Sequence, residues 1–443
     1  MRIQLSDHFN YNRLIRFVLP SIIMMIFTSI YGVVDGLCVS NFAGKTPFAA
    51  INLIFPVLMI VSSLGFMIGT GGSAIVARTL GEGDPARANR YFSMLVYATL
   101  IGGVIVSALG LILLRPLAVL LGAQGDMLEN CVLYGQINLL GMTAFMLQNM
   151  FQSLLITAEK AKLGLAVTIA AGVTNISLDL LFVAALRWGV AGAALATILS
   201  QVVGGVIPFV YFLRPNDSLL QLTRARLEGR VLLRACTNGS SELMSNISAS
   251  IVTMLYNLQL MKLAGEDGIA AYGVIMYVNF IFAAIFIGYS IGSAPIVGYH
   301  FGAQNHDELK NLFRRSLKLI AAASVAMLAL AELLSAPLAR IFVSYDADLL
   351  ALTTRGFRIY SLAFLMCGFN IFGSAFFTAL NDGLTSAAIS FLRTLVFQLL
   401  TVLLLPSLLG VDGVWFSIVV AEALALTATA GFLVAKRERY HYA

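Results

Sequence analysis

The chain has 443 residues, of which 59% are hydrophobic and only 11% are charged. Soluble domains carry about 25% charged residues, so this composition excludes a soluble enzyme and predicts an all-α integral membrane protein. The formal net charge of +6 is typical of Lys- and Arg-rich cytoplasmic loops, so it indicates no nucleic-acid partner.

Twelve apolar runs, each bounded by charged residues, Gly or Pro, predict twelve transmembrane helices. They cover residues 14–40, 48–77, 91–114, 128–157, 163–186 and 189–213, then 233–262, 270–299, 312–334, 351–380, 384–407 and 412–435. An even number of spans puts both termini on one side of the membrane. Twenty of the 28 Lys and Arg residues lie in the termini and in the loops after every second helix. The positive-inside rule therefore predicts a multi-pass protein of the cytoplasmic (inner) membrane with both termini in the cytoplasm.

The helices fall into two similar halves. The longest polar stretch predicts a cytoplasmic linker at 214–234 between a six-helix lobe at 1–213 and a second at 235–443. Residues of the first lobe recur in the second at an offset of 221: Asn149, Phe151, Ser153, Thr157 and Ala158 match Asn370, Phe372, Ser374, Thr378 and Ala379. Such duplication is typical of secondary transporters, whose halves enclose a central cavity. Chance similarity between apolar helices is the simpler alternative.

Two acids of the first half are expected inside the bilayer, where a charged side chain costs several kcal/mol without a partner, a cavity or a function. At about 1.5 Å per residue, Asp35 and Asp179 lie roughly 9 and 12 Å from the outer ends of their helices, and Thr197 is as deep as Asp179. Tyr134 lies about 9 Å inside its own helix end. We therefore expect these side chains to share one depth.

The helix at 163–186 has a polar face. Thr168, Gly172, Asn175 and Asp179 follow each other at helical spacing, and the opposite side, which includes Val173, Leu180 and Val183, is expected to face lipid. Thr28, Tyr31 and Asp35 stack in the same way on the first helix. These faces predict a polar chamber in the outer part of the first lobe.

Two carboxyl groups that face each other away from bulk water can exchange a proton or hold a cation between their oxygens. Asp35 and Asp179 are therefore candidate proton carriers, or Na⁺ ligands if the protein is sodium-coupled. The alternative is that each acid only forms a hydrogen bond with a neighbouring helix. No cofactor is expected, because the four cysteines form no CxxC pair.

The first helix of the second half carries Glu242 on a polar face with Asn246, Thr253 and Tyr256. We expect this face to line the central cavity, with Thr28, Asn149, Glu242 and Tyr256 as candidate substrate-binding residues. Glu242 is either a counter-ion for cationic substrates or a structural hydrogen-bond acceptor. Arg393 and Glu422 are expected at matching depths on the last two helices, which predicts a structural ion pair.

Four stretches together resemble the multidrug and toxic compound extrusion (MATE) transporters, in particular the prokaryotic branch with acids in the first half. They are PSIIMMIFTSIYGVVD from Pro20 to Asp35, GGSAIVARTLGEGDPARA from Gly71 to Ala88, the segment Glu159 to Gln201 with NISLD and GVAGAALAT, and SAPIVGYHFGAQN from Ser293 to Asn305. The resemblance extends over nearly the whole chain.

The resemblance implies an antiporter that expels amphiphilic organic cations in exchange for protons or sodium ions. It assigns coupling to Asp35, Asn175, Asp179 and Thr197, with Tyr31 and Tyr134 beside them. It also makes Pro20 the bending point of the first helix, which is physically reasonable because a proline within a helix frees a backbone carbonyl. The chain departs from some relatives at Tyr360 to Phe369, where YSLAFLMCGF contains no acid.

Two other functions fit the sequence less well than export. A flippase for a lipid-linked precursor is expected to have a strongly cationic cavity, whereas the predicted chamber here is acidic. An integral-membrane enzyme would need a polar cluster at one membrane face, and His300, His306 and Asp307 in a basic loop match no catalytic motif. We therefore predict a transporter rather than an enzyme, with small amphiphilic molecules and the bilayer as its partners, and expect it to work as a monomer.

Overall fold

The computed structural model describes residues 3–42, 45–344 and 346–443, and within these ranges it contains helices and no strand. The first half comprises α1 (Tyr11–Phe42), α2 (Lys45–Gly81), α3 (Pro85–Leu120), α4 (Gly125–Leu140), α5 (Met142–Thr157), α6 (Ala161–Asp179), the π-helical segment η1 (Leu180–Ala185) and α7 (Gly189–Leu213). The second comprises α8 (Gly229–Asn238), α9 (Ser240–Gly302), α10 (His306–Val343), α11 (Ala347–Ser361), α12 (Phe364–Ala379), α13 (Gly383–Phe391), the π-helical segment η2 (Leu392–Val396), α14 (Phe397–Leu409) and α15 (Val411–Tyr440).

The helices of the described ranges are long and apolar enough for up to 11 spans, if the bent pairs α4–α5 and α11–α12 each count as one. The 63-residue α9 supplies the twelfth, because it is a hairpin of two spans. Its Gly265 has φ 61° and ψ −146°, a conformation that a residue with a Cβ rarely adopts. The rings of Tyr256 and Tyr272 stack at 5.0 Å, whereas a straight helix would separate them by about 24 Å. The predicted all-α fold with twelve spans is confirmed.

Two spans that the sequence predicts as continuous helices, 128–157 and 351–380, are broken. The chain bends by 58° between α4 and α5 and by 50° between α11 and α12. The breaks lie at Gly141 and Leu362, which are separated by the same offset as the repeat. A Cβ at Gly141 would lie 2.8 Å from Cγ1 of Ile198, so close packing explains why a glycine stands at the first break. Nothing local explains the second.

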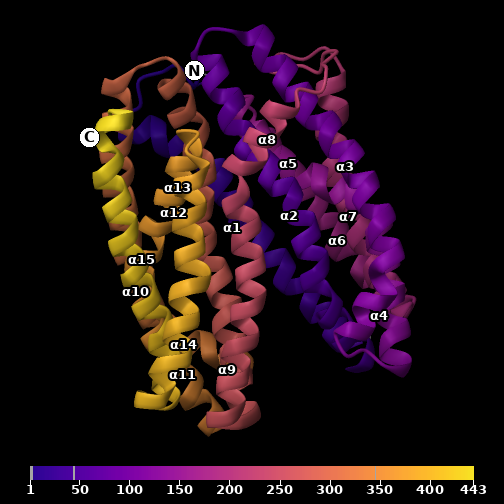
Figure 1. Ribbon diagram of the computed structural model, residues 1–443. Coiled ribbons are helices and arrows are strands. Elements are labelled where there is room, and N and C mark those ends of the chain that lie inside the picture. Colours follow the sequence, from indigo (N-terminus) through magenta and orange to yellow (C-terminus); the bar gives the residue numbers. More distant parts are fainter. Residues whose placement is uncertain (1–2, 43–44, 345) are drawn as a thin grey trace.

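The two halves are joined at the end of the molecule that holds both termini (Figure 1). There the side-chain amide of Asn238 donates to the carbonyl of Gly71 at 3.4 Å and to that of Thr378 at 2.9 Å. The backbone N–H of Phe9 donates to Oε1 of Glu308 at 2.9 Å. The helices of the two halves diverge toward the opposite end (Figure 1). This conformation therefore brings the halves together at the terminal end.

The predicted linker contacts the first half. The backbone N–H of Gln221 donates to Oδ1 of Asn89, and that of Thr223 donates to Oγ of Ser93. The helix α8 begins at Gly229, inside the predicted linker. The division into lobes at 1–213 and 235–443 stays a prediction.

Candidate ion and substrate site

The first and fifth spans approach closely because Gly172 has no side chain. A Cβ at this position of α6 would lie 2.5 Å from Cε1 of Phe27 and 2.9 Å from Cδ1 of Tyr31. Small residues at helix interfaces are the usual means by which membrane helices approach each other. The close contact puts the polar face of α6 against α1 at the level where both carry an acid.

At this level the carboxyl groups of Asp35 and Asp179 lie within hydrogen-bonding reach of each other. Asp179 has no exposed surface, and Asp35 is half-buried. Asn175, one turn before Asp179, is also buried. Because two carboxylates repel each other at this separation, their contact requires a shared proton or a cation.

Hydroxyl and amide groups of three more helices surround the acids. The side chain of Tyr134 on α4 lies next to that of Thr197 on α7, whose hydroxyl donates to the carbonyl of Ala193 at 2.9 Å. The side chain of Tyr31 lies next to Gln148 on α5. The structure thus brings the sequence-predicted coupling residues of α1, α4, α6 and α7 into one cluster.

The cluster has more acceptors than donors. Both carboxylate oxygens of Asp179, Oδ1 of Asp35 and Oδ1 of Asn175 are buried and have no hydrogen-bond partner within the described ranges. None of the ion pairs in the described part of the chain involves either acid. Buried carboxylates without a basic partner are costly, so these oxygens are suited to bind a proton or a small cation with oxygen ligands.

The four candidate substrate-binding residues differ in exposure. Thr28, whose hydroxyl donates to the carbonyl of Met24 at 2.9 Å, is partly exposed, as is Glu242 in the first turn of α9. Asn149 and Tyr256 are both 2% exposed, and Asn149 donates to the carbonyl of Ser62 at 3.2 Å. A substrate contact by Asn149 or Tyr256 therefore gains no support from this conformation.

Pro20 lies inside α1, which continues without interruption from Tyr11 to Phe42. Proline lacks the backbone N–H that would bond to the carbonyl of Arg16, so the helix is weakened at this turn. The helix is thus unbroken at the predicted hinge. Its role in bending stays a prediction.

The second half has its own buried polar centre. The guanidinium of Arg393, in η2, donates to Glu422 on α15 with N···O distances of 2.8, 2.9 and 3.0 Å. Asn370 donates to Oε2 of Glu422 at 2.7 Å and to its backbone carbonyl at 3.0 Å. Arg393 and Glu422 therefore form the ion pair expected from their depths. Asn370, the repeat counterpart of Asn149, links this pair to α12.

Sequence reasoning missed two residues of the first-half cluster and misplaced one neighbour. Gln148 contacts Tyr31, and Asn138 contacts Tyr134. Both are polar residues in an apolar span, a signal that could have identified them. Val183, expected to face lipid, is fully buried. The error arose because Val183 lies four residues after Asp179, which places it on the same helical face.

Twelve spans in two similar halves, with a pair of acids inside the first half that has no basic partner among the described residues, define a membrane transporter. The chain belongs to the MatE family, because the sequence model of that family matches residues 20–181 and again residues 243–404 of the chain. The resemblance to MATE transporters is thereby confirmed, and the double match repeats the internal similarity of the sequence.

Individual relatives cover nearly the whole chain. The multidrug export protein MepA of Staphylococcus saprophyticus is 24% identical over 427 residues, which are 96% of this chain and 94% of that protein. An outward-facing multidrug resistance MATE family transporter of the MOP superfamily has a TM-score of 0.90 and 25% identity, with 96% of this chain and 95% of that chain covered. A crystal structure of MATE in the straight conformation also has a TM-score of 0.90, at 24% identity and the same coverage.

Proposed function

We propose that this protein is an antiporter that exports amphiphilic organic cations in exchange for protons or sodium ions. The observation that carries the proposal is the contact between Asp35 and Asp179, whose buried oxygens lack donors within the described ranges. The proposal is supported by the similarity to MepA, a multidrug export protein. We further propose a monomer in the cytoplasmic membrane with both termini in the cytoplasm, as the distribution of Lys and Arg favours.

With this orientation the halves meet at the cytoplasmic end, so the conformation is outward-facing, and the ion reaches the acids from outside. Binding of a proton or Na⁺ removes the repulsion between Asp35 and Asp179 and changes the preferred packing of α1 against α6. An ion drives a conformational change only by its differential affinity for the two states. Substrate release is therefore coupled to the ion if a rearranged α1 binds the substrate less well.

The driving force available from one ion is sufficient for useful export. One elementary charge moving through 100 mV supplies about 2.3 kcal/mol, which corresponds to roughly fifty-fold in concentration. Export of a monovalent cation against the same potential largely cancels this contribution. For such substrates the pH or sodium gradient supplies the net driving force.

The test is efflux of a fluorescent organic cation from proteoliposomes under a proton gradient and, separately, a sodium gradient. Asp35→Asn and Asp179→Asn should each abolish gradient-driven efflux, and the gradient that drives the wild type names the ion. Asp126→Asn, an exposed acid of the same half, is the control and should transport normally. Normal efflux in both cluster variants would refute the proposed coupling site. If neither gradient drives wild-type efflux, the flippase becomes the better hypothesis.

A further inference from the structure

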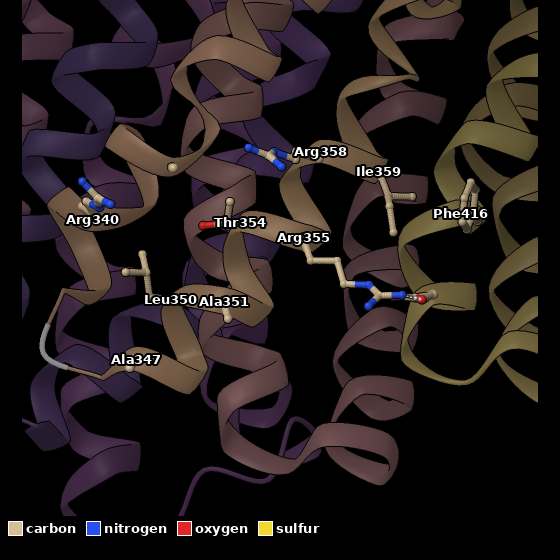
Figure 2. A pocket seen from close by; sticks show the side chains of 11 residues that line it. Arg340, Ala347, Leu350, Ala351, Thr354, Arg355, Arg358, Ile359 and Phe416 are labelled. Carbon is tan, nitrogen blue, oxygen red and sulfur yellow. Dashed lines mark hydrogen bonds and ion pairs between the residues drawn. The ribbon is translucent and has the colours of Figure 1, made fainter.

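A pocket of about 640 Å³ lies between α10, α11 and α15 in the second half. Figure 2 shows Arg340 of α10 with Arg355 and Arg358 of α11 around it, and Arg355 extends toward α15. The pocket is at the end of the molecule opposite the termini (Figure 1). It is thus separate from the acidic cluster of the first half.

The pocket has more positive than negative charge, and its cations are accessible. Arg355 forms an ion pair with Asp412, and Nε of Arg358 lies 3.2 Å from Oγ of Ser335 and 4.0 Å from Oε2 of Glu332. Arg340 is exposed and has no ion pair or hydrogen bond from its side chain among the residues that the structure describes. A guanidinium has five N–H donors, so most donors of the three arginines remain available.

These arginines are unusual for their side of the membrane. Seven Lys and Arg residues of the chain lie in the outer loops or helix ends, where the positive-inside rule predicts few. Three of the seven line this one pocket. By contrast, a basic pocket at the cytoplasmic end, lined by Lys310, Arg314 and other residues, needs no explanation beyond that rule.

The pocket lies where three predicted spans, 312–334, 351–380 and 412–435, end or begin, next to the lipid headgroups. In α10 the predicted hydrocarbon-spanning segment ends at residue 334, so Arg340 lies about 9 Å beyond that segment along the helix. Leu333 and Ile341 beside the pocket are 75% and 73% exposed, as residues that face lipid are. The pocket wall also includes the apolar side chains of Leu350, Ile359 and Phe416.

We infer that this pocket binds the phosphate of an anionic phospholipid from the outer leaflet. Arginine matches phosphate geometry with paired N–H donors, and the apolar wall is suited to the glycerol and first acyl carbons. The pocket lining contains three guanidinium groups and one carboxylate, that of Asp412, which favours a headgroup with net negative charge. The assignment to the outer leaflet and the argument from the positive-inside rule both rest on the cytoplasmic position of the termini proposed above.

The experiment is native mass spectrometry of the detergent-solubilised full chain titrated with phosphatidylglycerol or phosphatidylcholine. The wild type should retain one phosphatidylglycerol at concentrations where phosphatidylcholine is lost. Arg340→Gln should weaken this binding roughly tenfold or more, because it removes a charge-assisted hydrogen bond. Arg187→Gln removes an exposed charge from the same side of the membrane and should bind as the wild type does.

A second variant distinguishes loss of lipid binding from loss of folding. Ala351→Glu introduces a negative charge at an exposed position of the pocket wall and should also abolish retention, with unchanged thermal unfolding. Equal phosphatidylglycerol retention by the wild type and both pocket variants would overturn the proposal. Glycerol phosphate, titrated alone, tests for a soluble anion. Binding of glycerol phosphate as tight as that of the lipid would overturn the assignment to phospholipid.

Discussion

Removal of one partner of the Arg393–Glu422 pair should destabilise the second half strongly. In Arg393→Met, the carboxylate of Glu422, whose side chain is 3% exposed, keeps only the side-chain hydrogen bond from Asn370. Breaking a buried pair in this way typically costs about 3–5 kcal/mol. At roughly 2.1 cal/mol/K per residue, the unfolding entropy of this chain is about 0.9 kcal/mol/K, so Tm should fall by about 3–5 °C.

The double variant Arg393→Met/Glu422→Leu separates charge from packing. It removes both charges, and Asn370 keeps its hydrogen bond to the backbone carbonyl of residue 422. We expect it to regain most of the lost stability, because replacement of a whole buried pair by apolar residues is often neutral. The exposed pair Arg115–Glu129 is the matched control, since Arg115→Met should cost less than about 1 kcal/mol.

The assay is thermal unfolding in detergent, followed by transport in proteoliposomes of the variants that remain folded. A single variant with wild-type Tm would refute the reasoning, as would a double variant that is no more stable than the single one. Because the pair is expected to be structural, folded variants should transport normally. Loss of transport in a folded variant would assign the pair a transport role instead.

Three further variants test other features. Gly172→Leu should abolish transport in a folded protein, because a side chain there meets Phe27 and Tyr31 and separates the two acids; Gly102→Leu, with nothing within 4 Å of its Cβ position, should transport normally. Pro20→Ala should slow efflux while it raises Tm, because the restored helical hydrogen bond favours the straight α1; faster efflux would contradict a hinge. Burial raises the pKa of Asp382. The hydrogen bonds from Thr385 and Tyr440 and the charge of Lys436 together lower this pKa by more, so the net shift is downward. Its stabilisation should therefore be complete above about pH 4 and lost as pH falls through the depressed pKa; if the Tm difference between wild type and Asp382→Asn stays constant from pH 6 to 3, this reasoning is wrong.

The sequence predicted the spans and much of the candidate cluster for a clear physical reason. Apolar length reports a membrane span, and an acid inside a span identifies a polar face. Asp35, Asp179, Tyr134 and Thr197 were found in this way, because each interrupts an apolar run. Their convergence follows from equal depth on helices that pack side by side.

Other features depend on tertiary packing and leave little local signal. The break at Leu362 has no Gly or Pro, and only the repeat relates it to the break at Gly141. The sequence predicts a loop between two spans around Gly265, whereas in the structure the chain reverses direction at this single residue. The side-chain amide of Asn149, a candidate substrate contact, donates to the backbone carbonyl of Ser62 in this conformation, and its contact with substrate stays a prediction. A polar residue on a membrane helix does not reveal from sequence alone whether its partner is substrate or protein.

The Arg393–Glu422 pair also has an electrical consequence. In the second half the buried acid Glu422 is paired with a cation that belongs to the same chain, so the charge of this centre is neutralised without a mobile ion. The buried acids of the first half have no such tethered cation among the described residues, and only a mobile ion can balance them. Under the proposed function, the membrane potential therefore acts on a coupling ion held by Asp35 and Asp179, whereas it exerts little net force on the neutral Arg393–Glu422 pair.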